Sequence, residues 1–248
     1  DLVIADEFHL LGDGHRGARL EGAIDRFRRL NPFARVHGLS ATLGNRTELA
    51  NWMDGIEYHS THRPIELKWK QVRFRKADEK PKLLLNECLD CITQGGKTIV
   101  FVQSRRRAET LAKQLADNGL RSLHHHAGLA QKKRISVEES FRDGELDVLV
   151  ATPTLEMGVN LPARRVILYD LQHFDGQGFS PLSVTKVWQR VGRAGRPGLD
   201  DIGEAVLFSP TWDRSSHDYP SGKFEPVQSQ LSDKRFLAEQ IVAETTGG

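Results

Sequence analysis

Short apolar runs, separated by helix-like segments, set the strongest limit on the fold of this chain. Each run is five residues long; the runs lie at residues 1–5, 98–102, 147–151, 165–169 and 204–208. Runs of this length and composition are typical of strands buried in a parallel sheet. Helical patterns lie between them, as at residues 17–30 and 131–141. Strands that alternate with helices predict an α/β fold.

The composition fits a soluble globular protein. The chain has 248 residues, of which 38% are hydrophobic and 27% charged, and its net charge is +2. This length suits one large or two small domains. Because the net charge is small, any nucleic-acid site must be a local patch. No apolar run approaches the roughly 20 residues that span a bilayer, and the first residues do not form a signal peptide. We therefore expect a cytoplasmic protein with no membrane partner.

Cysteines and histidines, which often ligate metals, occur in two groups, and we interpret neither group as a metal site. Cys88 and Cys91 lie in a helical-looking segment at residues 82–93, and no second ligand pair has the spacing of a zinc site. We expect both to be reduced thiols. Three consecutive histidines occur at residues 124–126. Neighbouring side chains of an extended segment point to opposite faces, so all three cannot ligate one ion.

Two strand ends carry residues suited to phosphate chemistry. Asp6 and Glu7 follow the first apolar run, at the end of a strand where open α/β sheets bind ligands. Asp6 could hold Mg²⁺ through water, and Glu7 could activate an attacking water. The alternative is an acidic strand-to-helix turn. Ser40 and Thr42 follow a strand at residues 36–39, where they could contact these carboxylates or merely cap a helix expected at residues 47–53.

An arginine-rich stretch is the second candidate site. Residues 189–198 have the sequence Gln-Arg-Val-Gly-Arg-Ala-Gly-Arg-Pro-Gly. On a helix, Gln189, Arg193 and Arg196 would lie at i, i+4 and i+7 and share one face. Two guanidiniums side by side suit a triphosphate, because they donate planar, bidentate hydrogen bonds. The alternative is a solvated end of an Arg-rich helix.

These segments resemble the motifs of superfamily 2 helicases. Residues 189–196 resemble motif VI, Asp6 to His9 resemble motif II, and residues 40–42 resemble motif III. Ser104, before a helix that starts at Arg105, resembles motif IV. Residues 152–163, which contain Gly-Val-Asn-Leu-Pro, resemble motif V of the Ski2-like DExH branch. Phe8 departs from the smaller residue usual between Glu and His in motif II.

The resemblance implies a role for each candidate. Asp6 would hold Mg²⁺, Glu7 would activate water, and the catalytic set would also include Gln189, Arg193 and Arg196. Gly158 and Asn160 would lie near ATP. Ser104, Arg105 and Thr152 would bind a nucleic-acid backbone, DNA or RNA, single-stranded or partly duplex. The coupling residues would be His9, Ser40 and Thr42. The resemblance implies ATP-dependent helicase or translocase activity with 3′-to-5′ polarity.

The resemblance also implies a domain organisation. We expect a tandem RecA-like α/β motor in which residues 1–63 are the end of the first domain and residues 82–226 the complete second. Residues 64–81 would connect them, with a short strand around residues 65–69. The basic residues near Trp69 and Phe74 are interpreted as a solvated strand, with contact to a phosphate backbone as the alternative. Residues 227–248 would begin a winged-helix domain. No phosphate-binding loop of the form Gly-x-x-x-x-Gly-Lys occurs in the sequence. We therefore expect an amino-terminally truncated motor; a non-hydrolysing nucleic-acid-binding fragment and an ATPase that translocates without unwinding are the alternatives.

Overall fold

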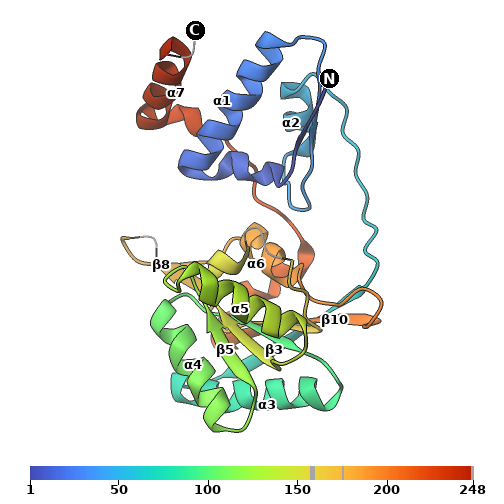
Figure 1. The fold of residues 1–248 in the computed structure, drawn as a ribbon, viewed down its shortest axis with the longest axis vertical. Coiled ribbons are helices and arrows are strands. Elements are labelled where there is room, and N and C mark those ends of the chain that lie inside the picture. The colour runs from blue at the N-terminus through green and yellow to red at the C-terminus, as the bar shows by residue number, and fades with distance from the viewer. Residues whose placement is uncertain (157–159, 175, 247–248) are drawn as a thin grey trace. The chain divides into compact units, whose positions relative to one another are not determined.

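The computed structural model describes residues 1–156, 160–174 and 176–246. It divides into two compact units, which are drawn in Figure 1. Unit 1 comprises Asp1–Ser60 and the described part of Lys223–Gly248, and unit 2 comprises Thr61–Gly222. The carboxyl-terminal segment thus belongs to the first compact unit. Each unit has its own hydrophobic core and is described by itself.

Unit 2 is built on a parallel sheet. Its six described strands are β3 (Glu66–Phe74), β10 (Ile202–Pro210), β7 (Arg165–Leu168), β4 (Thr98–Phe101), β6 (Val148–Ala151) and β5 (Ser122–His125), named here in their order across the sheet. Every pairing between neighbours is parallel. All residues of β4, β6 and β7 are buried. The apolar runs at residues 98–102, 147–151 and 165–169 are therefore the strands at the centre of this sheet, as predicted, whereas the run at residues 1–5 lies in unit 1 and is mostly exposed.

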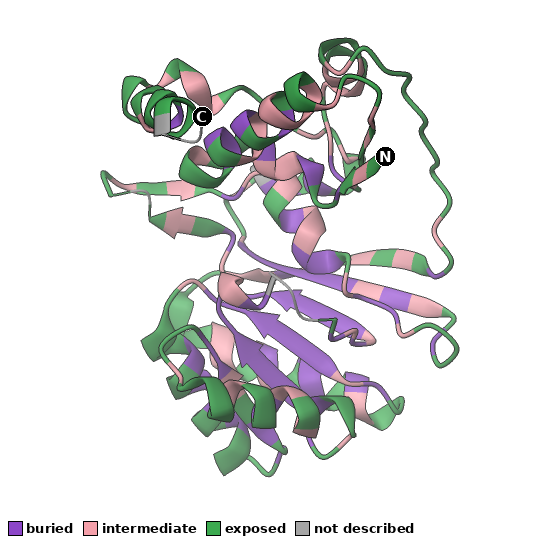
Figure 2. Ribbon diagram, turned by 45° about the horizontal axis from the view of Figure 1, so that its top comes forward, coloured by how far each residue is buried: buried purple, intermediate pink, exposed green. Residues whose placement is uncertain are grey.

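Helices cover both faces of this sheet, because alternate residues of each strand face opposite sides. On one face, Ile99 and Leu149 pack with α5 (Gln131–Arg142) and α6 (Val184–Val191). On the other, Val100 and Val150 pack with α3 (Lys80–Thr93) and α4 (Arg105–Asp117). Figure 2 shows the buried strands of the sheet beside helices whose outer faces are exposed. Cys88 and Cys91 are free thiols buried on α3.

The short strand expected near residues 65–69, within the predicted connection at residues 64–81, is longer in the structure. Residues 66–74 form β3, which pairs with β10 along nine residues at the edge of the sheet. Trp69 packs against one core cluster and Phe74 against the other, while Lys68 and Lys70 are exposed. An edge strand is covered less than a central one, so its alternating pattern resembled a solvated strand rather than a core element.

Unit 1 contains a small parallel pair, β1 (Leu2–Ala5) and β2 (Arg35–Gly38). A 3₁₀ turn at Phe8–Gly12 leads into α1 (Gly14–Leu30), and α2 (Arg46–Trp52) follows β2. The helix α7 (Lys234–Thr246) lies against α1, held by ion pairs of Arg19 with Glu239 and of Arg29 with Glu244. Its apolar residues Leu237, Ile241 and Val242 are exposed, because α7 meets α1 through polar side chains. The winged-helix assignment of this segment stays a prediction.

A short antiparallel pair of strands lies between β7 and α6. Strands β8 (Gln172–Phe174) and β9 (Phe179–Pro181) pair antiparallel. Their two aromatic rings, Phe174 and Phe179, are exposed and lie edge to face with centroids 5.5 Å apart. Strands of three residues are too short to show an alternating pattern, so sequence periodicity did not predict them. No helix among the described residues has the length and apolarity needed to cross a membrane.

Candidate functional site

The acidic candidates of unit 1 lie together at the carboxyl ends of β1 and β2. These strands are parallel with Ala5 opposite Gly38, so the residues that follow them meet. The His9 ring connects the two segments that follow these strands: its Nδ1 atom lies 3.2 Å from Ser40 Oγ and 3.3 Å from Glu7 Oε2. The backbone N–H of Thr42 donates to the same Ser40 oxygen at 3.2 Å. The structure therefore brings Glu7, His9, Ser40 and Thr42 into one hydrogen-bonded group.

Phe8 fixes the backbone on which this group is built. Its ring is 2% exposed, and its N–H donates to Leu39 O at 2.8 Å. The ring lies directly on Gly38, where an added Cβ would come within 2.7 Å of it. Glu7, just before it, has φ 51° in the left-handed region, which costs a non-glycine residue about 1–3 kcal/mol. Anchoring of Phe8 holds Glu7 in this conformation, so the unusual aromatic residue has a structural role.

The electrostatics of the group favour a neutral histidine. Burial lowers the pKa of His9 below its ordinary value, and the nearby Glu7 carboxylate opposes part of that shift. Asp6 and Glu7 are exposed, and Asp6 Oδ1 accepts a hydrogen bond from Glu7 N at 2.8 Å. Exposed carboxylate oxygens at a strand end are the ligands that Mg²⁺ prefers, so these residues fit the ion. The helix-cap alternative for Ser40 and Thr42 does not apply, because Asn45 precedes α2.

The nucleic-acid candidates of unit 2 lie at the carboxyl ends of two neighbouring strands, β4 and β6. Ser104 caps α4, and its Oγ accepts a hydrogen bond from Arg107 N at 3.2 Å. Arg105 is exposed, and its guanidinium lies against Gly128. Thr152 follows β6 and its hydroxyl lies 3.0 Å from that of Thr154. Ser104 is thus a helix cap in the structure, and its contact with a phosphate stays a prediction.

Hydrogen bonds of the histidine run join two segments of unit 2. His124, His126 and Glu109 place their ligand atoms within 4.8 Å of one another, so two of the histidines do converge with a carboxylate. However, Gly128 N donates to His126 Nδ1 at 3.1 Å, which puts the ring proton on Nε2, where it is donated to Glu109 at 2.9 Å. A ligating histidine has the opposite pattern, in which the second ring nitrogen donates. The cluster therefore joins α4 to the segment after β5.

The arginine-rich stretch is not one helix, contrary to the sequence prediction. The helix α6 ends at Val191, so only Gln189 of the three predicted residues lies on it. Backbone hydrogen bonds join Ala163 N to Arg193 O at 3.0 Å and Gly195 N to Ala163 O at 2.7 Å. Gly195 has φ 92°, a conformation that does not continue an α-helix. Pairing with Ala163 therefore replaces the helical hydrogen bonds, and residues 192–196, the arginine loop, leave the helix axis.

Side chains from distant segments hold the arginine loop. Arg63 donates to Ala194 O at 2.9 Å. Ile65 fills the space beside Gly195, where an added Cβ would lie 2.6 Å from Ile65 Cγ2. Arg196 forms an ion pair with Asp200, with 2.7 Å between Nε and Oδ2. These three partners were not predicted from the sequence; only Asp200, four residues after Arg196, had a local signal.

The candidates of unit 2 fall at the two opposite ends of its sheet. Ser104 and Thr152 follow β4 and β6 at the carboxyl ends. The arginine loop meets Ala163 and Gly95, which precede β7 and β4 at the amino ends. Asn160 is exposed in the segment that returns from one end to the other, and Gly158 lies outside the described residues. The sheet thus separates the residues predicted to bind nucleic acid from the arginines predicted to act on nucleotide.

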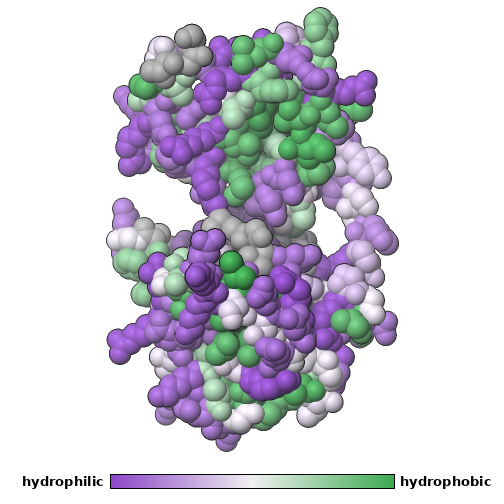
Figure 3. Space-filling model, in the orientation of Figure 1, coloured by the Kyte–Doolittle hydropathy of each residue, from purple (hydrophilic) through white to green (hydrophobic). Residues whose placement is uncertain are grey.

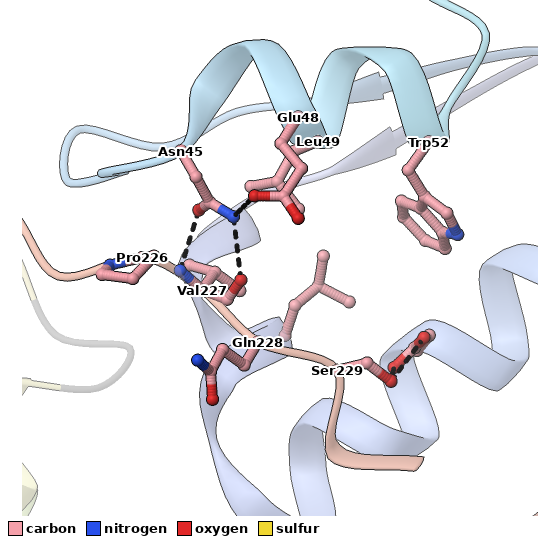
Figure 4. Close-up of a pocket in the computed structure, with 10 residues that line it drawn as sticks. Asn45, Glu48, Leu49, Trp52, Pro226, Val227, Gln228 and Ser229 are labelled. Carbon is pink, nitrogen blue, oxygen red and sulfur yellow. Dashed lines mark hydrogen bonds between the residues drawn. The ribbon is translucent and has the colours of Figure 1, made fainter. Parts of the chain in front are cut away.

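A cavity in unit 1 is lined by none of the predicted residues. Its volume is about 480 Å³, and it lies between α2 and residues 226–229 (Figure 4). Asn45 exchanges two hydrogen bonds with the backbone of Val227, at 3.0 and 2.8 Å. The cavity therefore marks where two distant segments of the chain are joined. Figure 3 shows hydrophobic side chains gathered on this face of unit 1, between α1 and α2.

Comparisons with known proteins agree with the motif assignments. Residues 79–198 match the helicase conserved C-terminal domain. The ATP-dependent DNA helicase Hel308 of Thermoplasma volcanium is 35% identical over 262 residues, which cover 93% of this chain and 39% of that protein. Hel308 of Pyrococcus horikoshii is 34% identical, covering 98% of this chain and 39% of its own. The chain therefore spans about two fifths of the length of these relatives.

A solved structure gives the same result for the fold. The helicase Lhr of Mycobacterium smegmatis, solved bound to ssDNA and AMP-PNP, superposes with a TM-score of 0.66 and 26% identity. The match covers 92% of this chain and 32% of that one. The parallel sheet of unit 2, with helices on both faces, is the RecA-like α/β arrangement expected from the motifs. The chain belongs to the superfamily 2 helicases of the Ski2-like branch.

Proposed function

We propose that the protein containing this chain is an ATP-dependent helicase or translocase that moves 3′ to 5′ along DNA. The observation that carries the proposal is the arginine loop, whose backbone is held by a β-bridge at one end of a sheet and which carries Arg193 and Arg196; the other end of the sheet carries the nucleic-acid candidates. DNA is proposed as the substrate because the Hel308 relatives are named DNA helicases and Lhr was solved with ssDNA. The sequence contains no Walker-type loop, which such an enzyme needs.

The acidic group of unit 1 has the chemistry for the hydrolytic step. Asp6 would hold Mg²⁺ through water, and the ion would neutralise phosphate charge. Glu7, held in its left-handed conformation by Phe8, would orient and deprotonate the attacking water. His9 bonds both Glu7 and Ser40, so a change at the carboxylate is passed to the second strand. Coupling through His9, Ser40 and Thr42 is part of this proposal.

The candidate residues of unit 2 would have two roles, one toward the nucleotide and one toward the nucleic acid. Arg193 and Arg196 would stabilise negative charge on the γ-phosphate in the transition state, with Gln189, Gly158 and Asn160 close to the nucleotide. Ser104, Arg105 and Thr152 would bind backbone phosphates of one strand. An arginine that acts mainly on charge developing during reaction contributes to turnover more than to ground-state affinity.

The test uses the intact protein and its ATP turnover stimulated by single-stranded DNA. Arg193→Ala and Arg196→Ala should each lower kcat by about 10³-fold or more, as expected for an arginine finger. The KM for ATP should change by less than about tenfold. Arg142→Ala removes an exposed arginine from the end of α5 and serves as the matched control. Near-normal turnover in both loop variants would show that their guanidiniums are structural.

A second measurement tests the nucleic-acid side. Arg105→Ala should weaken DNA binding and reduce the slope of log affinity against log salt by about 1, the effect of losing one phosphate contact. Displacement of a strand from a duplex with a 3′ tail, but not with a 5′ tail, is expected for the proposed polarity. Turnover without displacement would favour a translocase that does not unwind. DNA binding without turnover would favour a non-hydrolysing protein.

A further inference from the structure

We propose that Asp200 is a positioning residue that fixes the Arg196 guanidinium in the orientation from which it acts on the nucleotide. The inference rests on the proposed function, because it assigns how one of the two arginines is prepared for its role. It concerns a residue outside the eight-residue motif VI and is drawn from the contacts of the arginine loop.

The contact between the two side chains is a buried fork. Asp200 Oδ2 accepts hydrogen bonds from Arg196 Nε at 2.7 Å and from Arg196 N at 2.9 Å, while Oδ1 accepts from Nη2 at 2.8 Å. The side chain of Asp200 is 2% exposed and that of Arg196 is 14% exposed. A backbone hydrogen bond from Asp200 N to Arg196 O, at 2.9 Å, closes the turn between them. Both the backbone and the side chain of Arg196 are thus tied to one carboxylate.

The fork leaves a defined part of the guanidinium for another partner. Nε and Nη2 are used by Asp200, and Nη2 also donates to Gly95 O at 3.2 Å. The Nη1 group takes no part in these bonds, so its two N–H donors point in a direction set by the fork. Because Asp200 compensates the charge of Arg196, the pair contributes directed hydrogen-bond donors more than net positive charge. Donors that are already oriented need no reorganisation when charge develops in the transition state.

The ionisation state of Asp200 favours a lasting pair of hydrogen bonds with the Arg196 guanidinium. Burial disfavours the carboxylate, but hydrogen bonds from Arg196 outweigh this effect and hold the pKa of Asp200 below its ordinary value. The carboxylate is therefore charged at neutral pH. A long, flexible arginine without such a partner would sample several rotamers, and small displacements of a catalytic group can reduce rates about 100-fold.

The experiment measures DNA-stimulated ATP turnover of the intact protein carrying Asp200→Asn, with Asp201→Asn as the matched control. Asp201 is the exposed neighbour, so its substitution makes the same change of charge without touching Arg196. For Asp200→Asn we expect kcat to fall about 10- to 100-fold while the KM for ATP stays within about threefold. Asp200→Glu keeps the carboxylate and should recover a large part of kcat. This variant tests the proposal even if Asp200→Asn folds poorly.

A double-mutant cycle separates this inference from the proposed function. In the Arg196→Ala background, Asp200→Asn should change kcat by less than about twofold, because its effect passes through Arg196. Independent, multiplying effects would overturn the positioning role. So would normal turnover of Asp200→Asn beside a strongly impaired Arg196→Ala. Normal turnover of Arg196→Ala would instead overturn the proposed role of the arginine itself, and this inference with it.

Discussion

At the scale of single residues, His9 shows how burial and a neighbouring charge oppose each other. Its ring bonds Ser40 and lies 3.3 Å from the Glu7 carboxylate, yet burial is the larger effect and its pKa is lowered. Both contacts are made by the same atom, Nδ1, which carries a proton in one neutral tautomer and accepts a hydrogen bond in the other. The protonation of His9 therefore reports on the state of the acidic group.

The first prediction concerns this titration. The His9 ring should titrate below about 6.5, its ordinary value. Glu7→Gln should lower that pKa further, because the Glu7 charge favours the imidazolium. Since the folded-state pKa is lowered, the contribution of His9 to stability is complete above about pH 6.5. It is lost as the pH falls through the folded-state value. Ring ¹⁵N NMR against pH measures the shift, with Glu48→Gln as a control; a higher pKa in Glu7→Gln would contradict the interpretation.

At the scale of elements, an ion cluster fixes α3 on the sheet of unit 2. Arg165 lies in the central strand β7 with its side chain 3% exposed. It donates to Glu204 on β10 at 2.5 Å, and to Glu87 and Asp90 on α3 at 3.1 and 2.8 Å. One buried cation thus connects two strands and a helix. The partners differ in exposure, because the Asp90 side chain is 50% exposed while that of Glu87 is 11% exposed.

The second prediction follows from this difference. Arg165→Met should destabilise unit 2 by about 3–5 kcal/mol, because it leaves the Glu204 carboxylate without its buried partner and the Glu87 carboxylate paired only with the half-exposed Lys70. Asp90→Asn removes a largely exposed carboxylate and should cost at most about 1 kcal/mol. Urea unfolding followed by the fluorescence of Trp69 and Trp188, which lie in this unit, measures both. Equal losses in the two variants would show that burial does not set the strength of this cluster.

The elements also show what local sequence could and could not predict. The runs at β4, β6 and β7 were predicted because buried strands are apolar along their whole length. The arginine loop was predicted as a helix because its spacing fits one, while its actual conformation depends on Ala163, about 30 residues away. Asp200 and Arg63 act through tertiary contacts that leave no periodic signal. Sequence therefore placed Asp6, Ser104 and Thr152 correctly after strand ends, while the contacts that orient the arginines were not predictable.

At the scale of the whole molecule, the two units differ in how much apolar surface they bury. The buried core of unit 1 consists of Ala5, Phe8, Leu11 and Ile24, under a two-stranded sheet. Leu2 and Ile4 on its first strand are each 58% exposed. The sheet of unit 2 lies instead between two large clusters, one on each face. Because stability rises with buried apolar area, the units should open independently and at different free energies.

Hydrogen exchange on this chain tests that expectation. Amides of β4, β6 and β7 should be the most protected, and those of β1 and β2 should exchange faster, through openings of lower free energy. Phe8→Ala should accelerate exchange throughout residues 1–60, since truncating a buried aromatic costs about 3–5 kcal/mol. It should leave the protection of β4, β6 and β7 unchanged. Val150→Ala, made in the core of unit 2, is the converse variant and should lower protection there alone. If Phe8→Ala reduced protection equally in both units, they would unfold as one cooperative body, and the acidic group and the arginine loop would share a single stability.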